Sequence, residues 1–221
     1  MRIVVLVATQ NEWLSLLKLL GNHSAIQEAP IGEFVDIHYD NASLVAVHSG
    51  VGKVNAAAAA QYAILTWRPD RLVVLGTSGA VSPDLAVLDV VVADRTIVYD
   101  MVSDVGGNID ENIRDLTTLL SVPHLPVDSS IHVGTVLTGD RDVTPASAET
   151  LYRLYGGLVA DWESGAAAKV CKMNRVDCLV LRGVSDTPYV TDATQHDSYV
   201  QNTPRVMERL WRLLPQLLPI R

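Results

Sequence analysis

The chain has 221 residues, of which 48% are hydrophobic and 19% charged, and its formal net charge is −8. This length suits one α/β domain spanning residues 1–221, with enough core to fold without a disulfide or metal staple. The acidic balance, 17 Lys and Arg against 25 Asp and Glu, argues against a nucleic-acid partner. No apolar run approaches the ~20 residues of a membrane span. Cys171 and Cys178 match no zinc ribbon, CxxC pair or disulfide framework. We therefore expect a soluble cytoplasmic protein that has no membrane partner.

Short β-branched and aliphatic runs alternate with helical stretches along the chain. The first run, residues 2–7, is continuously apolar, which is typical of a strand covered on both faces. Predicted strands span residues 2–7, 33–39, 43–47, 71–75, 87–93, 131–137, 157–160 and 176–184. The second and third form a hairpin around Asp40 and Asn41, and glycines predict a turn at 76–79.

Helical periodicity fills the segments between these strands. Helices are predicted at residues 11–20, 54–65, 147–155 and 165–173, with an amphipathic helix over the last 20 residues. Residues 102–130 have the least regular pattern, and we expect this segment to pass over one edge of the sheet. The alternating order predicts an α/β fold with a mixed, largely parallel central sheet flanked by helices on both faces.

Three carboxylates follow apolar runs closely, at the positions where open α/β sheets bind ligands. These are Glu12, Glu163 and Asp186. Taken singly, Glu12 and Glu163 could be helix caps or solvated charges, since both lie near predicted helix starts. Asp186 follows eight mostly apolar residues, so it is expected to be more buried than a cap. Three carboxylates at one cleft favour acid–base chemistry on a neutral or cationic substrate.

Other chemistries find little support in the sequence. Residues 50–53 (Gly-Val-Gly-Lys) lack the spacing of a Walker A loop and of a dinucleotide fingerprint, so they are either a tight strand-to-helix turn or a set of backbone donors for a ligand. The six histidines show no metal-ligand spacing, and no G-x-S-x-G motif marks a serine nucleophile. We predict neither a cofactor nor a metal.

Seven short stretches, in order and at matching spacing, resemble the nucleoside phosphorylase/nucleosidase superfamily, most closely its 5'-methylthioadenosine/S-adenosylhomocysteine nucleosidase branch. They are IVVLVATQNE (3–12), SGVGKVNAA (49–57), LGTSGAVSP (75–83), LDVVVAD (88–94), TGD (138–140), VADWESGA (159–166) and VLRGVSD (180–186). The resemblance covers roughly residues 1–186. It implies a three-layer α/β sandwich, usually as a homodimer, and a purine nucleoside as the small-molecule substrate.

The resemblance also implies residue roles. Asp186, paired with Ser185, matches the acid that protonates the purine at N7, and Glu163 matches the carboxylate that binds the ribose hydroxyls. Glu12 matches the residue that activates the attacking water. Thr77 stands where the family has a small hydroxyl residue near base and ribose. In a further position, Val143 belongs to the segment that closes over the purine.

N-ribosidic cleavage builds positive charge on the sugar and negative charge on the base. An acid at the base and carboxylates near the sugar serve both ends, as in glycoside hydrolysis. Phosphorylases of the superfamily carry an arginine before the central glycines, where this chain has Val74. A buried phosphate without a cation is unfavourable, so water is the expected nucleophile.

Two departures from the family pattern bear on the substrate. Trp162 replaces a methionine before Glu163, and is either a core aromatic or a stacking partner for the base or sugar. Asp142 stands where an aromatic usually stacks on the purine. The alternatives that stay open are another purine nucleoside such as futalosine, a phosphorylase with unusual phosphate ligands, and a non-catalytic nucleoside-binding module.

Overall fold

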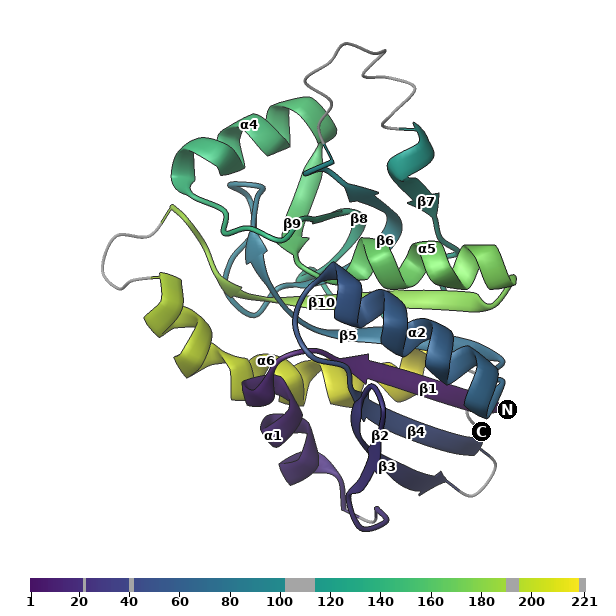
Figure 1. Ribbon diagram of the computed structural model, residues 1–221. Coiled ribbons are helices and arrows are strands. Elements are labelled where there is room, and N and C mark those ends of the chain that lie inside the picture. Colours follow the sequence, from purple (N-terminus) through teal and green to yellow (C-terminus); the bar gives the residue numbers. More distant parts are fainter. Residues whose placement is uncertain (22, 40–41, 102–113, 190–194, 219–221) are drawn as a thin grey trace.

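The computed structural model describes residues 1–21, 23–39, 42–101, 114–189 and 195–218 (Figure 1). The strands are β1 (Arg2–Val7), β2 (Gln27–Ala29), β3 (Gly32–Tyr39), β4 (Ala42–His48), β5 (Arg71–Ala80), β6 (Val90–Val98), β7 (Thr117–Leu119), β8 (Ile131–Thr138), β9 (Gly157–Asp161) and β10 (Asp177–Asp186). The helices are α1 (Gln10–Leu19), α2 (Lys53–Trp67), α4 (Pro145–Tyr155), α5 (Ser164–Asn174) and α6 (Gln195–Leu217). The fold is therefore α/β, as predicted.

The strands form one sheet with both parallel and antiparallel pairs, as the sequence predicted. Its order is β10-β6-β8-β9-β5-β1-β4-β3-β2, with β7 beside β6. The pairs β1–β4, β1–β5, β5–β10, β6–β8 and β8–β9 are parallel, and β10 also pairs with β6 in the antiparallel sense. Because β10 touches both β5 and β6, the strands β5, β10, β6, β8 and β9 close into a ring. This ring brings the ends of β5, β9 and β10 together.

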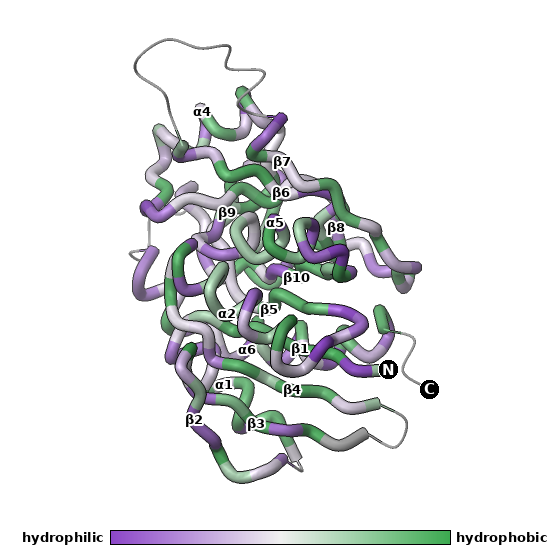
Figure 2. Tube along the Cα trace, turned by 45° about the vertical axis from the view of Figure 1, so that its right-hand side comes forward, coloured by the Kyte–Doolittle hydropathy of each residue, from purple (hydrophilic) through white to green (hydrophobic). Residues whose placement is uncertain are grey.

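Alternating side chains of β1 enter two separate cores. Ile3, Val5 and Val7 pack with residues of α1 and α6, whereas Val4 and Leu6 pack with residues of α2 and α5. Figure 1 shows α2 and α5 side by side, and α1 likewise packs against α6. The central strands are largely hydrophobic in Figure 2, as expected of strands covered on both faces.

Local sequence explains where two helices begin. At α1, the Thr9 hydroxyl accepts a hydrogen bond from the Glu12 backbone N–H, and the Glu12 carboxylate accepts one from the Thr9 N–H. This reciprocal arrangement is a capping box. At α4, Thr144 and Ser147 exchange bonds in the same way, and Pro145 occupies the first turn. Both helix starts lie directly after strand-end segments that carry candidate site residues.

Three sequence predictions differ from the structure. The predicted turn at residues 76–79 is wrong, because β5 continues to Ala80 and pairs there with β10. The strand predicted at residues 87–93 begins at Val90 and runs on to Val98, after Leu88 adopts a φ of 78°. The sequence did not predict β2 and β7, of three residues each.

The predicted turn at Asp40 and Asn41 lies outside the described residues, as do residues 102–113 of the irregular segment 102–130. In the part of the chain that is described, no helix is long and apolar enough to cross a membrane.

Candidate active site

A cavity of about 580 Å³ lies where β1, β4, β5, β8, β9 and β10 end. Its walls also include the first residues of α6. All seven residues predicted for the site line it: Glu12, Thr77, Val143, Trp162, Glu163, Ser185 and Asp186. The prediction that these strand ends share one cleft is confirmed.

Glu12 combines a structural contact with a place in the cavity wall. Its side chain is buried, at 1% exposure, although the residue belongs to the first turn of α1. Oε1 accepts hydrogen bonds from the Thr77 backbone N–H and from the Thr77 hydroxyl, the latter at 2.7 Å, and Oε2 accepts from the Thr9 N–H at 2.9 Å. A carboxylate has about four acceptor positions, so about one remains for a further donor. Glu12 is therefore both part of the helix cap and part of the cavity wall.

Glu163 belongs to a buried charged cluster around Arg182. The Arg182 Nη2 lies 3.3 Å from Glu163 Oε2, and its Nε lies 2.7 Å from Asp161 Oδ2. Glu163 Oε1 accepts a hydrogen bond of 2.9 Å from the Gly52 N–H. Burial raises the pKa of Glu163 to about 7, and Arg182, which acts in the opposite direction, offsets only part of this. Glu163 therefore takes up a proton near neutral pH.

The two glycine segments keep backbone close to these carboxylates. Gly52 has a φ of 93°, which is unfavourable for other residues, and this conformation directs its N–H to Glu163. A Cβ on Gly76 would lie 2.6 Å from Glu12 Oε1 and 2.4 Å from Arg182 Nη1. Glycine at residue 76 therefore allows the strand to pass next to the carboxylate and the guanidinium. Both segments serve the site through their backbone rather than as turns alone.

Asp186 lies apart from this cluster, at the end of β10. Its Oδ1 accepts a 2.7 Å hydrogen bond from the Ser185 hydroxyl, and its Oδ2 a 3.4 Å bond from Gln195. Burial raises the pKa of Asp186 and Asp142 adds to this, although the Ser185 and Gln195 hydrogen bonds act in the opposite direction. The carboxyl is thereby predisposed to keep a proton at a pH where an exposed aspartate has lost it.

The cavity thus has two ends, and each is defined by a few residues. The Glu163 end comprises Glu12, Thr77, Asp161, Glu163 and Arg182. The Asp186 end comprises Asp142, Val143, Ser185, Asp186 and Gln195. Trp162 also lines the cavity and is 36% exposed. The prediction that this residue could be an aromatic of the hydrophobic core is therefore wrong.

The cavity wall contains more acidic than basic side chains. Among the described lining residues, Arg141 is the one arginine, whereas the carboxylates are Glu12, Asp142, Asp161, Glu163 and Asp186. Arg182 lies directly behind this wall, but Asp161 and Glu163 already engage it. Such a wall is expected to bind a neutral or cationic ligand better than a phosphate anion. The described residues form no cluster of His, Cys, Asp or Glu suited to a metal ion.

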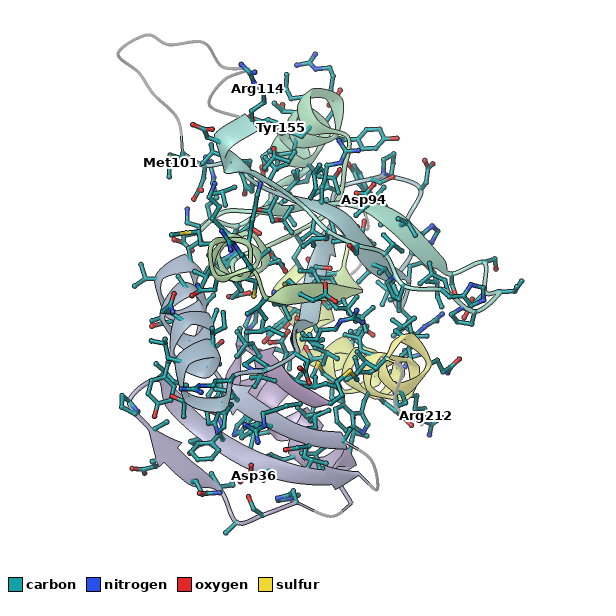
Figure 3. The ribbon with its side chains drawn as sticks, turned by 90° about the vertical axis from the view of Figure 1, so that its right-hand side faces the viewer. Asp36, Asp94, Met101, Arg114, Tyr155 and Arg212 are labelled. Atoms are coloured by element: carbon teal, nitrogen blue, oxygen red, sulfur yellow. The ribbon has the colours of Figure 1, made fainter. Side chains whose placement is uncertain are left out.

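Arg182 and Asp161 are site residues that the sequence analysis missed. Arg182 interrupts the apolar run of β10 and is 1% exposed, in contrast with Arg212 on the outer face of α6, whose side chain is 78% exposed (Figure 3). A charge within an apolar strand requires a buried partner, and this was the available signal. Gln195 and Tyr199, near the start of α6, also line the cavity, and no sequence motif marked them.

Comparison with known proteins decides the family. A model of the phosphorylase superfamily matches residues 2–219 of the chain. The chain belongs to the phosphorylase superfamily. This confirms the resemblance that the seven sequence stretches indicated.

Relatives in this superfamily include two kinds of nucleosidase. The aminodeoxyfutalosine nucleosidase of Campylobacter jejuni is 25% identical over 220 residues, which cover 93% of this chain and 94% of the relative. The 5'-methylthioadenosine/S-adenosylhomocysteine nucleosidase of Shewanella piezotolerans is 26% identical over 213 residues, covering 90% and 92%.

Solved structures agree with the fold of this superfamily member. The 5'-methylthioadenosine/S-adenosylhomocysteine nucleosidase of Helicobacter pylori superposes with a TM-score of 0.83 at 21% identity, over 98% of this chain and 97% of that one. The futalosine hydrolase of the same organism gives a TM-score of 0.82 at 21% identity, with the same coverage. At these identities the likeness concerns the fold alone.

Proposed function

We propose that this superfamily member hydrolyses the N-ribosidic bond of a purine nucleoside of the methylthioadenosine or adenosylhomocysteine type. The observation that carries the proposal is that one cavity has two distinct ends. At one end Glu163 and Asp161 pair with Arg182, and at the other end Asp186 lies apart from this cluster. A nucleosidase needs this division, since positive charge develops on the sugar while the leaving base becomes negative. The names of the relatives support the same bond type.

Asp186 is proposed as the acid that protonates the purine at N7. Its raised pKa favours the protonated form, and the cause is burial at the end of an apolar strand. When the proton leaves, the Ser185 hydroxyl stabilises the new carboxylate through its 2.7 Å hydrogen bond. A general acid requires both properties, a proton at working pH and a stabilised conjugate base.

Glu12 is proposed to orient and deprotonate the attacking water. Three donors from Thr9 and Thr77 fix its carboxylate and leave about one acceptor position free toward the cavity. Glu163 is proposed to accept hydrogen bonds from the ribose hydroxyls, with Thr77 beside base and ribose. Val143 and Trp162 are proposed to contact the base or sugar, because both border the cavity.

Water is favoured over phosphate as nucleophile because acidic side chains outnumber basic ones in the cavity wall, where Arg141 is the one described arginine. An anion placed between the carboxylates would meet repulsion that a neutral water does not. The runner-up substrate is another purine nucleoside such as futalosine; one similar structure is named a futalosine hydrolase and one relative an aminodeoxyfutalosine nucleosidase. By the family resemblance we also propose a three-layer sandwich, a homodimer and a cytoplasmic location.

The test is release of free base from methylthioadenosine, adenosylhomocysteine, adenosine, inosine and futalosine, each with and without phosphate. Hydrolysis of the first two without phosphate is the expected result. Strict dependence on phosphate would overturn hydrolysis, and selective turnover of futalosine would replace the substrate class. Binding of every nucleoside with turnover of none would identify a non-catalytic binding module.

A further inference from the structure

The start of α6 contributes Gln195, His196 and Tyr199 to the cavity wall, and Gln195 and Tyr199 form hydrogen bonds there. Gln195 and Tyr199 are four residues apart, so they share one face of the helix. Gln195 Nε2 donates to Asp186 Oδ2 at 3.4 Å and to the Val143 carbonyl at 3.1 Å. Both amide N–H groups of this side chain are therefore committed to the Asp186 end.

Tyr199 reaches the other end of the cavity through Thr9. Its half-buried hydroxyl donates to the Thr9 hydroxyl oxygen at 2.8 Å. That same oxygen accepts from the Glu12 backbone N–H at 3.2 Å, and the Thr9 N–H donates to the Glu12 carboxylate. Tyr199 thus fixes the capping box that orients Glu12, without contacting the carboxylate itself.

We propose that Gln195 and Tyr199 are positioning residues. Through them, the start of α6 fixes the distance between the acid, Asp186, and the water-activating carboxylate, Glu12. This proposal rests on the roles proposed above for Asp186 and Glu12. One rigid turn in contact with both ends fixes their separation, and a misplacement of a reacting group by about 1 Å can cost about 100-fold in rate. The two residues act on different carboxylates, so their loss has different signatures.

Removal of Gln195 changes the proton affinity of Asp186. Its N–H stabilises the ionised form, so replacement by methionine raises the pKa of Asp186 and moves the alkaline limb of the pH–rate profile upward. Asp142 lies near Asp186 and acts in the same upward direction, and Arg141 and His196 border the same cavity. The variant leaves these groups in place. The weaker acid and less stable carboxylate lower kcat, and loss of the bond to Val143 raises KM.

Removal of the Tyr199 hydroxyl acts at the Glu12 side of the cavity. Tyr199→Phe keeps the ring and its packing, but it frees the Thr9 hydroxyl to rotate away from the capping box. The expected result is a lower kcat with an alkaline limb at the wild-type pH, because the hydroxyl bonds Thr9 and none of the described contacts joins Tyr199 to Asp186. The two variants therefore separate the ends of the site.

The experiment compares Gln195→Met and Tyr199→Phe with two matched controls. Gln216→Met alters an exposed glutamine near the other end of α6 that bonds only the Arg212 carbonyl in the described contacts. Tyr189→Phe removes a hydroxyl that donates to the Val81 carbonyl, outside the residues that line the cavity. Full-length proteins are assayed for kcat, KM and pH–rate profile on the best substrate, and their thermal unfolding is recorded.

We expect Gln195→Met to lower kcat about tenfold and to raise the alkaline limb by about half a pH unit or more. We expect Tyr199→Phe to lower kcat about fivefold without moving that limb, and both controls to match the wild type. Should Gln195→Met fold poorly, Gln195→Asn withdraws the amide by one methylene and gives the same readout.

Wild-type kcat in either variant overturns the proposal, as does an alkaline limb that stays in place with Gln195→Met or moves with Tyr199→Phe. Asp186→Asn, measured in parallel, separates this failure from that of the proposed function. Base release by Asp186→Asn at the wild-type rate removes the acid assignment. An inactive Asp186→Asn beside wild-type-like Gln195→Met and Tyr199→Phe removes only the positioning roles.

Discussion

The Glu163 end and the Asp186 end of the cavity both bury carboxylates, but only the Glu163 end holds a buried guanidinium among its described residues. Arg182 lies between Asp161 and Glu163 and keeps two acidic side chains stable in the interior. The Asp186 end instead offers neutral donors from Ser185 and Gln195. Burial raises the pKa of both Glu163 and Asp186, but a guanidinium opposes this rise at one end and neutral hydrogen-bond donors oppose it at the other.

The largest expected effect comes from Asp186→Asn. The amide has a similar shape but no acidic proton, so base release should fall by about 10² to 10⁴-fold while nucleoside binding survives. The measurement is base release under single-turnover conditions, together with calorimetric binding of the nucleoside. Near-wild-type turnover would show that the acid lies elsewhere.

The matched control at the same end is Asp142→Asn. Asp142 raises the pKa of Asp186, so its neutral replacement should lower that pKa and move the alkaline limb of activity to lower pH. Turnover at the pH optimum should persist. Loss of activity equal to that of Asp186→Asn would mean that Asp142 is itself required for the chemistry.

At the Glu163 end, Arg182→Met removes the guanidinium that distinguishes this end from the Asp186 end. Asp161 and Glu163 would keep their hydrogen bonds but remain buried without a cationic partner, which costs about 3 to 5 kcal/mol of unfolding free energy. The measurement is the midpoint and slope of urea unfolding. The control is Arg212→Met, since the side chain of Arg212 is 78% exposed and pairs only with Glu208 in the described contacts. Equal stability of both variants would contradict a structural role for the Arg182 cluster.

Sequence could predict the elements that depend on local pattern. The apolar run of β1 and the positions of Glu12, Glu163 and Asp186 after strands were sufficient to place these residues at one cleft. The same reasoning failed at residues 76–79, because glycines there meet a long-range need: Gly76 passes Glu12 and Arg182 too closely for a Cβ. Arg182 itself was missed because its partners come from β9 and the start of α5, and no local pattern records them.

A smaller effect, dependent on pH, is expected from Glu163→Gln. Burial raises the pKa of Glu163 from 4.5 to about 7, so the folded protein binds this proton more tightly than the unfolded chain does. The group therefore favours folding below pH 4.5, and its contribution is lost as pH rises from 4.5 through 7, by up to about 3 kcal/mol. Glutamine cannot titrate, so the variant's stability should decline less over this interval.

The measurement for this variant is urea unfolding at several values between pH 4.5 and 8. Glu149→Gln on α4 is the control, since Glu149 is exposed and should leave the wild-type slope unchanged. A Glu163→Gln profile parallel to that of the wild type would show that Glu163 is not the group that takes up the proton.

The smallest effect is expected from Trp162→Ala, which tests whether the border between the two ends contacts the substrate. Trp162 lines the cavity and is 36% exposed, so its removal opens little core and should change the unfolding free energy only slightly. Loss of one stacking contact is worth about 0.5 to 1.5 kcal/mol, so KM should rise about 2- to 12-fold while kcat stays near wild type. Trp162→Phe keeps an aromatic face and should recover most of this loss. An unchanged KM in Trp162→Ala would mean that the ring only borders the cavity, and a fall in kcat with constant KM would instead place it against Glu163, the neighbouring carboxylate in the chain.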